Sequence, residues 1–147
     1  MKHLIIITLL IFVTLIAGCR DTSKPVDLPK LYPCTITITQ EGVPLAGAMI
    51  ELLPADGSSV KYRAVTVTGE DGKAAMATYR HAGVPVGKFK VVVDKDDFGA
   101  AKNADTYRLV EAKYSSAETT PLEIEITGKG RVEKTFDVGK AVKVLVK

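Results

Sequence analysis

The sequence predicts an all-β protein, an antiparallel β-sandwich of seven or eight strands. Three observations support this fold class. From residue 33 onward, apolar and polar residues alternate with a period of two, which is typical of strands with one buried face. Glycine- and proline-containing turn signals separate these segments, and no long amphipathic helix interrupts them. Short strands separated by frequent turns favour a sandwich over a mixed α/β fold.

The first half of the domain provides four of the expected strands. Cys34, Ile36 and Ile38 alternate with threonines, and the Glu-Gly-Val-Pro segment at 41–44 then has the residues of a turn. A second turn, Gly-Glu-Asp-Gly at 69–72, has glycines that can adopt positive φ without steric cost. The expected strands here are 34–39, 46–53, 60–68 and 73–79.

The second half provides the remaining strands. After a Gly-Val-Pro-Val-Gly loop at 83–87, Phe89, Val91 and Val93 alternate with polar residues apart from Val92. Later, a Gly-Lys-Gly turn at 128–130 separates two more alternating segments. The expected strands here are 89–93, 122–126, 133–138 and 141–146.

Residues 95–121 depart from this rhythm and form a connection longer than a compact sandwich usually needs. Tyr107, Val110 and Tyr114 stand at i, i+3 and i+7, which predicts a short helical turn that covers an open end of the sandwich. The long loop is therefore expected to hold one short helix.

Residues 1–18 have the three parts of a secretory signal peptide: a basic start, an apolar segment and small residues at the break. The apolar segment, 4–17, has fourteen residues, interrupted only by two threonines. A membrane-spanning helix needs about 20 apolar residues, so this segment predicts an export signal rather than a transmembrane anchor.

The end of this segment, Leu15-Ile16-Ala17-Gly18-Cys19, resembles the bacterial lipobox. The resemblance implies that Leu15, Ala17 and Gly18 are recognised by the lipoprotein signal peptidase, and that Cys19 is lipidated and begins the mature chain. Two or more acyl chains give stable membrane anchoring. Arg20, rather than aspartate, follows Cys19, which under the sorting rule of enteric lipoproteins implies the outer membrane of a bacterial cell envelope. The alternative is an ordinary signal peptide with a chance cysteine.

Residues 19–32 are expected to be the lipidated cysteine and a flexible tether, followed by a single sandwich domain at 33–147. The twelve residues of 20–31 contain two prolines and little apolar periodicity. At full extension they reach at most about 40 Å, enough to hold a domain clear of the headgroups.

The composition excludes some partners and some chemistry. The formal net charge of the chain is +3, and its charges are scattered, whereas a nucleic-acid-binding protein needs a concentrated basic face. We therefore expect no nucleic-acid partner. If Cys19 carries lipid, Cys34 is the only other cysteine and cannot form an intramolecular disulfide. Its alternation with Ile36 and Ile38 favours a buried small hydrophobe over a reactive thiol.

Three segments together resemble the carboxypeptidase regulatory-like domains of prealbumin-like, transthyretin-like fold: GVPLAGA at 42–48, TGEDGK at 68–73 and GVPVGKFKVVV at 83–93. The segments KYSS at 113–116, TPLEI at 120–124 and TFDV at 135–138 resemble the tail of small envelope lipoproteins of planctomycete-type bacteria. The resemblance covers about residues 33–138. It implies an immunoglobulin-like sandwich that serves as an accessory or binding module, and it supports the fold more strongly than the function.

The sequence has no recognisable set of catalytic or metal-binding residues at the spacing that such sites need. We therefore expect a protein that is not an enzyme and has no cofactor or metal. His81 is the only histidine after residue 18, and no second ligand stands at metal-binding spacing. Hydroxyisourate hydrolases share the fold, but they use several histidines and a Tyr-Arg-Gly-Ser ending that this chain lacks. Ser115 and Ser116 have no nucleophile motif. Asp94, Asp96 and Asp97 leave a weak calcium alternative, without the glycine and terminal glutamate of a calcium loop.

Two functions remain. The first is a membrane-anchored envelope lipoprotein whose non-enzymatic sandwich is a structural or interaction module with a protein partner. The second is a carbohydrate- or peptide-binding accessory domain, with loops 95–121 and 83–87 forming a ligand rim and Tyr107 and Tyr114 facing the ligand. Buried tyrosine rings would favour the first function, and exposed rings over a groove would favour the second. The chain has no tryptophan, which weakens the glycan hypothesis.

Overall fold

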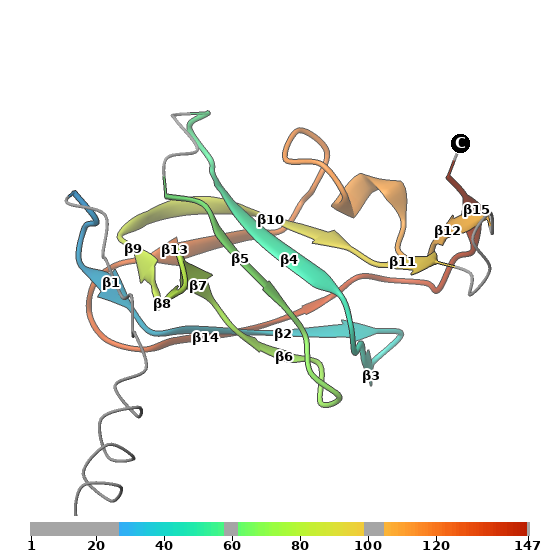
Figure 1. The fold of residues 1–147 in the computed structure, drawn as a ribbon, viewed down its shortest axis with the longest axis horizontal. Helices are drawn as coiled ribbons and strands as arrows, with labels where there is room; N and C mark the ends of the chain where they lie inside the picture. The colour runs from blue at the N-terminus through green and yellow to red at the C-terminus, as the bar shows by residue number, and fades with distance from the viewer. Residues whose placement is uncertain (1–26, 58–61, 99–104, 147) are drawn as a thin grey trace, which may run out of the picture.

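The computed structural model describes residues 27–57, 62–98 and 105–146. Two β-sheets face each other across one apolar core, and a smaller sheet lies at one end (Figure 1). The helical element that lies wholly within these residues is a single 3-10 turn, η3, at Ala112–Tyr114, and Tyr62 also has 3-10 conformation. The prediction of an all-β sandwich is confirmed.

The first sheet contains six strands and is antiparallel throughout. Its order is β13 (Glu123–Ile126), β10 (Gly87–Asp94), β4 (Met49–Pro54), β5 (Ala64–Val67), β7 (Ala77–Thr78) and β8 (His81–Ala82). The long strand β10 lies between β4 and β13 and runs the length of the sandwich (Figure 1).

The second sheet has β2 (Cys34–Gln40) at its centre. Its strands are β14 (Val132–Asp137), β2, β3 (Val43–Pro44) and β6 (Lys73–Ala75). The pairing of β14 with β2 is parallel, while β3 and β6 pair with β2 in the antiparallel sense. The alternation of residues predicted both long strands, but it contains no information on the direction in which they would pair.

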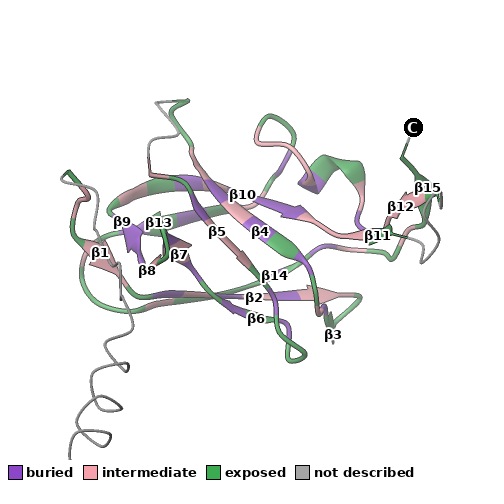
Figure 2. Cartoon of the chain, in the orientation of Figure 1, coloured by how far each residue is buried: buried purple, intermediate pink, exposed green. Residues whose placement is uncertain are grey.

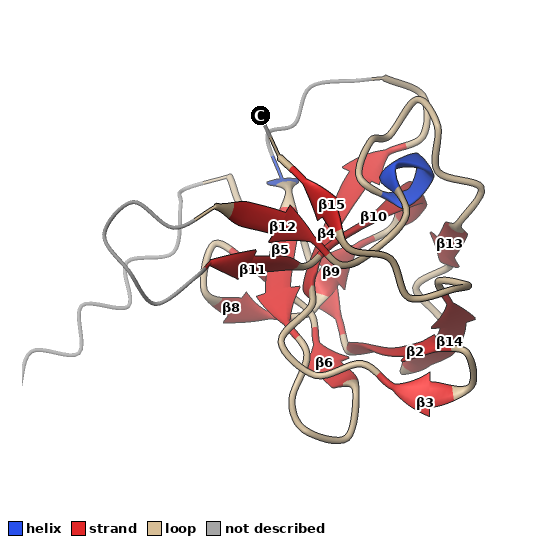
Figure 3. Cartoon of the chain, turned by 90° about the vertical axis from the view of Figure 1, so that its right-hand side faces the viewer, coloured by secondary structure: helices blue, strands red, loops and turns tan. Residues whose placement is uncertain are grey.

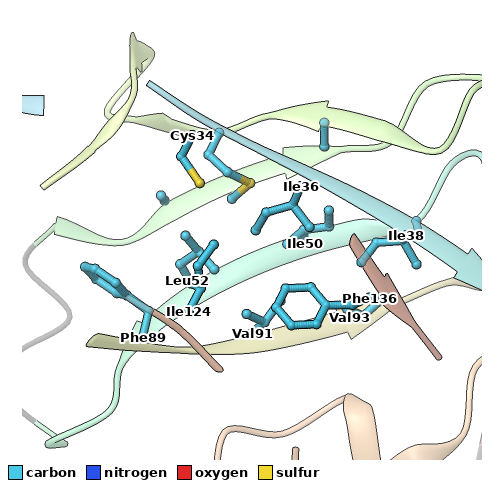
Figure 4. Packing of buried hydrophobic residues seen from close by; sticks show 14 of the residues in the cluster. Cys34, Ile36, Ile38, Ile50, Leu52, Phe89, Val91, Val93, Ile124 and Phe136 are labelled. Atoms are coloured by element: carbon cyan, nitrogen blue, oxygen red, sulfur yellow. The ribbon is translucent and has the colours of Figure 1, made fainter. Parts of the chain in front are cut away.

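The core is built from the inward positions that the period of two predicted. Ile36 and Ile38 of β2 are completely buried, as are Val91 and Val93 of β10, and these side chains meet between the two sheets (Figure 4). Burying a side chain of this size stabilises the fold by about 1.5–3 kcal/mol. The core therefore fixes which face of each strand points inward and sets the register of the sandwich.

The expected strand at 73–79 is divided between the two sheets. β6 pairs with β2 in one sheet, and β7 pairs with β5 in the other. Met76, between them, is buried, and its N–H donates to the carbonyl of Cys34 at 2.9 Å. The chain crosses the core at Met76, so one alternating segment serves both layers.

The chain is paired with the sandwich before residue 33. β1 (Leu31–Tyr32) pairs antiparallel with β9 (Val84–Pro85). The hydroxyl of Tyr62 also donates a 2.9 Å hydrogen bond to the carbonyl of Asp27. Residues 27–32, which fall within the expected flexible tether, therefore lie on the sandwich.

The long connection at 95–121 contains more structure than one helical turn. It includes β11 (Asp96–Phe98) and β12 (Thr106–Arg108), which pair antiparallel, and then η3. The predicted short helix is confirmed at η3. β12 pairs in turn with β15 (Val144–Leu145), so the end of the chain joins this small sheet instead of the sandwich core.

We call the sheet formed by β11, β12 and β15 the β15 sheet, and the two ends of the sandwich the β1 end and the β15 end. In Figure 1 these ends lie on the left and on the right. Figure 3, turned to face the β15 end, shows the β15 sheet in front of the strands of the sandwich.

Candidate functional site

The β15 sheet exposes an unusual amount of apolar surface. Among the described residues, nine large hydrophobic side chains are exposed, and four of them lie on or beside β11 and β15: Phe98, Val144, Leu145 and Val146. Figure 2 shows the exposed colour along β11 and β15. Contiguous exposed apolar surface is typical of interaction sites.

The pairing register separates the side chains of this sheet into two faces. Asp96 lies opposite Arg108, which lies opposite Val144, and residues directly opposite each other share a face. Because faces alternate along each strand, Phe98 and Val146 lie on that same face. We call Phe98, Arg108, Val144 and Val146 the β15 face.

Three aliphatic or aromatic side chains of the β15 face are open to solvent. Phe98 is 73% exposed, Val144 57% and Val146 40%. Fully burying a side chain of this kind is worth about 1.5–3 kcal/mol, so a partner that covered all three would gain substantial affinity before the costs of association.

A groove continues the β15 face toward η3. It has a volume of about 390 Å³ and is lined by residues of β12, η3 and the final segment: Arg108, Val110, Glu111, Ala112, Lys113, Val142 and Val144. Lys113 and Glu111 form a 2.9 Å ion pair at its rim. The site thus combines an apolar floor with charged groups at the edge, as protein-binding surfaces do.

Arg108 is the charged member of the β15 face, and two carboxylates flank it. Its Nε lies 3.7 Å from Asp94 Oδ1, and Asp96 is its cross-strand partner. Asp97 belongs to the opposite face, where Lys143 Nζ approaches its carboxylate at 3.6 Å. The acidic segment therefore has protein cations as partners on both faces.

This arrangement bears on the calcium alternative. Within the part of the chain that the structure describes, no three His, Cys, Asp or Glu side chains come together as a possible metal site. Asp97 points away from Asp94 and Asp96 because faces alternate along β11, and so the three carboxylates do not converge.

Tyr107 and Tyr114, the two tyrosines expected to face a ligand, have different environments. Tyr114 is 6% exposed and belongs to the core, with Val110 buried beside it, which corrects the ligand-facing prediction for this residue. Tyr107 is half-buried, and Lys143 Nζ lies 4.7 Å from its ring centroid. By the criterion of buried rings, Tyr114 favours the scaffold function.

The two loops expected to form one ligand rim adjoin opposite ends of β10. Loop 83–87 leads into the first residue of β10, and residues 95–121 begin where β10 ends. Eight residues of strand separate these points by about 25 Å. The first part of residues 95–121 is therefore remote from loop 83–87, whereas Thr120, near its end, donates a 2.8 Å hydrogen bond to the carbonyl of Val91 in the middle of β10.

A separate groove of about 460 Å³ lies at the β1 end. Its lining includes three prolines, two lysines and the aromatic residues Tyr62 and Phe89: Pro29, Lys30, Pro54, Asp56, Tyr62, Pro85, Val86, Gly87, Lys88 and Phe89. The rings of Tyr62 and Tyr79 pack edge to face at 6.5 Å between centroids. Tyr62 thus serves to hold Asp27 and Tyr79 as well as to line the groove.

Cys34 and His81 are two described residues whose side chains could take part in nucleophilic catalysis. Cys34 is buried, and this burial raises the pKa of its thiol to about 11, so the thiol stays protonated and unreactive at neutral pH. This confirms the prediction of a buried small hydrophobe. His81 lies on β8 opposite Thr78, beside a shallow hollow lined by Lys30 and Leu31.

The lipobox residues Leu15, Ala17, Gly18 and Cys19 lie outside the described residues, as does the whole expected signal peptide at 1–18. In the described part of the chain, none of the helical structure has the length and apolar character to cross a membrane.

Comparisons with known proteins give similarity to solved structures but no match in sequence. No protein-family model matches the sequence, and no curated protein matches it. Among solved structures, the chain is similar to a variant of BcpA, the major pilin subunit of Bacillus cereus, with 15% sequence identity and a TM-score of 0.49. The similarity covers 75% of this chain and 30% of the pilin, so the chain spans less than a third of that protein's length.

The β15 face is not predicted by the alternation of residues in the sequence. The alternation places Val144 and Val146 in the last strand of the sandwich and gives Phe98 no role. One signal was available: Phe98 is an isolated apolar residue directly after a run of charged residues, which is not a pattern of core strands.

Proposed function

We propose that this chain is a lipid-anchored envelope protein whose sandwich is a non-enzymatic module that binds another protein through the β15 face. The observation that carries the binding role is the exposure of Phe98, Val144 and Val146 on one face of a sheet at the end opposite β1. The anchoring role is supported by the lipobox-like sequence that ends at Cys19.

Three features favour a protein partner over a glycan. The exposed apolar side chains of the β15 face are two valines and one phenylalanine, whereas sugar sites stack their ligands on several aromatic platforms. β11 and β15 each pair on one side only among the described strands, so both leave backbone donors and acceptors for an added strand. The groove beside η3 extends the apolar surface, and its volume of about 390 Å³ is large enough for a side chain of the partner to enter.

Site-specific photo-crosslinking in intact cells tests the binding role. A photoreactive phenylalanine analogue replaces Phe98, and matched probes replace Val67 on β5 and Val86 at the β1 end, which have exposed fractions of 57% and 58%. We expect a discrete protein adduct from position 98 and none from position 67. An adduct from position 86 alone would support the peptide-binding alternative at the β1 groove instead.

Metabolic labelling with an alkyne-tagged fatty acid tests the anchor. The wild-type chain and Cys34→Ala are expected to incorporate the label, whereas Cys19→Ala is expected to lose it. Because the chain contains only these two cysteines, the pair of variants separates a lipobox from non-specific thiol acylation. Equal labelling of Cys19→Ala and wild type would overturn the anchor.

A further inference from the structure

The place where the chain joins the sandwich limits how the domain can sit on a membrane. β1 is paired with β9, and the Tyr62 hydroxyl holds the carbonyl of Asp27 at 2.9 Å. Lys30 Nζ also lies 5.2 Å from the centroid of the Tyr32 ring. The chain is thus attached to the β1 end from Asp27 onward, and only the residues before Asp27 separate this end from Cys19.

That separation is short compared with the sandwich. Seven residues lie between Cys19 and Asp27, and at full extension they allow at most about 29 Å. The strand β10 alone spans about 25 Å from the β1 end toward the β15 end. If Cys19 is lipidated, the β1 end is therefore the end of the sandwich that the anchor draws to the membrane.

Basic side chains gather at the β1 end. Lys30 and Lys88 line the same groove, and Lys30 shares a second hollow with His81. The turn that precedes Lys129 packs here too, because a Cβ at Gly128 would lie 3.2 Å from the Tyr32 ring and 3.1 Å from Val86. Arg80 is at the tip of the hairpin between β7 and β8.

Some of this charge is balanced locally. Asp27 also lies at this end, Asp56 lines the groove, and Glu125 stands opposite Lys88 in register. Arg63 is paired with Glu51 at 2.9 Å. The β15 end has the opposite bias, because its carboxylates outnumber its cations. These carboxylates are Glu41, Asp94, Asp96, Asp97, Asp105, Glu111 and Asp137, against Lys95, Arg108, Lys113, Lys140 and Lys143. An anionic surface therefore attracts one end and repels the other.

Val86 completes the arrangement at the β1 end. It is 58% exposed and lies beside Lys88 in the groove lining, with Lys30 on the same groove. An apolar side chain surrounded by lysines is suited to a membrane surface, where apolar groups enter the interface and ammonium groups contact phosphates.

We infer that the β1 end, through Lys30, Arg80, Lys88, Lys129 and Val86, rests on the anionic phospholipid headgroups of the membrane that holds the lipid on Cys19. This inference depends on the proposed lipid anchor and extends it. It orients the domain: the β1 groove faces the headgroups, and the β15 face points away from the membrane toward its protein partner.

Lysine footprinting tests this orientation with controls already present in the chain. The full-length lipidated protein is reconstituted in vesicles of phosphatidylcholine with phosphatidylglycerol, or of phosphatidylcholine alone, and treated with a membrane-impermeant amine reagent. We expect labelling of Lys30, Lys88 and Lys129 to fall at least about threefold in the anionic vesicles only, and to recover at about 1 M salt. Labelling of Lys73, which pairs with the middle of β2, and of Lys140, beside Gln40 at the β15 end, is expected to stay unchanged.

Charge-reversed variants provide a second measurement. Lys88→Glu combined with Lys129→Glu is expected to abolish the protection of Lys30, whereas Lys73→Glu combined with Lys140→Glu is expected to preserve it. Equal labelling at both ends, or protection of Lys73 and Lys140 instead, would overturn the orientation while leaving the anchor intact. If the N-terminal peptide of the purified protein carries no acyl chains on Cys19, both the anchor and the orientation are overturned. Failure of the orientation alone can therefore be distinguished from failure of the anchor.

Discussion

The carboxylate of Asp137 accepts a 2.9 Å hydrogen bond from the backbone N–H of Gly42, which joins the end of β14 to the turn between β2 and β3. The same oxygen accepts from the Thr39 hydroxyl at 2.8 Å, and the other oxygen accepts from the N–H of Gly139 at 2.8 Å. Glu41 and Gly42 both have positive φ, as a type I′ turn requires. Asp137 thus stabilises a turn in which Glu41, the first of the two central residues, has a positive φ that is unfavourable for a residue other than glycine.

Replacing Asp137 by asparagine is expected to lower the free energy of unfolding by about 1 kcal/mol at neutral pH, after allowance for solvent at this exposed site. The hydrogen bonds from Gly42, Thr39 and Gly139 lower the pKa of the Asp137 carboxyl below its usual value. A lowered folded-state pKa gives stability that is present above the unfolded-state pKa and is lost as the pH falls. The stabilities of wild type and Asp137→Asn in urea unfolding should therefore converge as the pH falls below the usual range of aspartate.

Glu70→Gln is the control for this prediction, because it removes an exposed carboxylate in the turn between β5 and β6. We expect it to have little effect at either pH. An equal loss of stability in both variants would show that the bonds to Asp137 are not the cause.

Two glycines with positive φ provide a matched test of packing at the turns. Gly72 has a φ of 71°, and a Cβ there would lie 2.6 Å from the carbonyl oxygen of Ile38. Gly42 has a φ of 79° with no atom within 4 Å of its Cβ position. Gly42→Ala is expected to cost about 1–2 kcal/mol from backbone strain alone, and Gly72→Ala at least about 3 kcal/mol. Equal losses of unfolding free energy in the two variants would contradict the close approach of Gly72 to the backbone of Ile38.

Tyr114 and Tyr107 separate a core role from a surface role on one connection. Tyr114→Ala removes a buried ring and is expected to lower the free energy of unfolding by about 3–5 kcal/mol, as for other large aromatic truncations. Tyr107→Ala removes a half-buried ring and is expected to cost less than about 1.5 kcal/mol. Thermal or urea unfolding measures both. A small loss for Tyr114→Ala would revive the ligand-facing hypothesis for that residue.

The buried thiol of Cys34 predicts a loss of stability at high pH. Its pKa is raised from 9.0 to about 11 by burial, so the folded state holds the proton more tightly than the unfolded state. A raised folded-state pKa gives stability that is complete below pH 9 and falls as the pH rises to about 11, by up to about 3 kcal/mol. Cys34→Ala should show a shallower slope between these pH values, since tyrosine and lysine titrations are common to both proteins. Identical slopes would contradict the prediction.

The sequence predicted the fold because the alternation of residues encodes which face of a strand is buried. Ile36, Ile38, Val91 and Val93 are buried as expected. Alternation does not encode which strands pair, so the parallel neighbour of β2 and the crossing at Met76 could not be predicted. The strands of two residues, such as β1 and β9, are too short to produce a periodic signal.

The candidate site was harder to predict than the core. The i, i+3, i+7 spacing of Tyr107, Val110 and Tyr114 indicated a helical turn, and η3 contains the last of the three. Spacing shows that residues share a face, but it does not show whether that face meets the core or the solvent. The β15 face also depends on pairing between β12 and β15, which are separated by more than thirty residues of sequence.

The parallel neighbours β2 and β14 have a mechanical consequence. β2 starts at the β1 end, and β14 finishes at the β15 end, next to the segment that leads to β15. A load between the membrane and a partner on the β15 sheet would therefore pull these two strands in opposite directions along their length. The hydrogen bonds of all six residue pairs would resist this force together, in shear, instead of breaking one after another as in an unzipping hairpin.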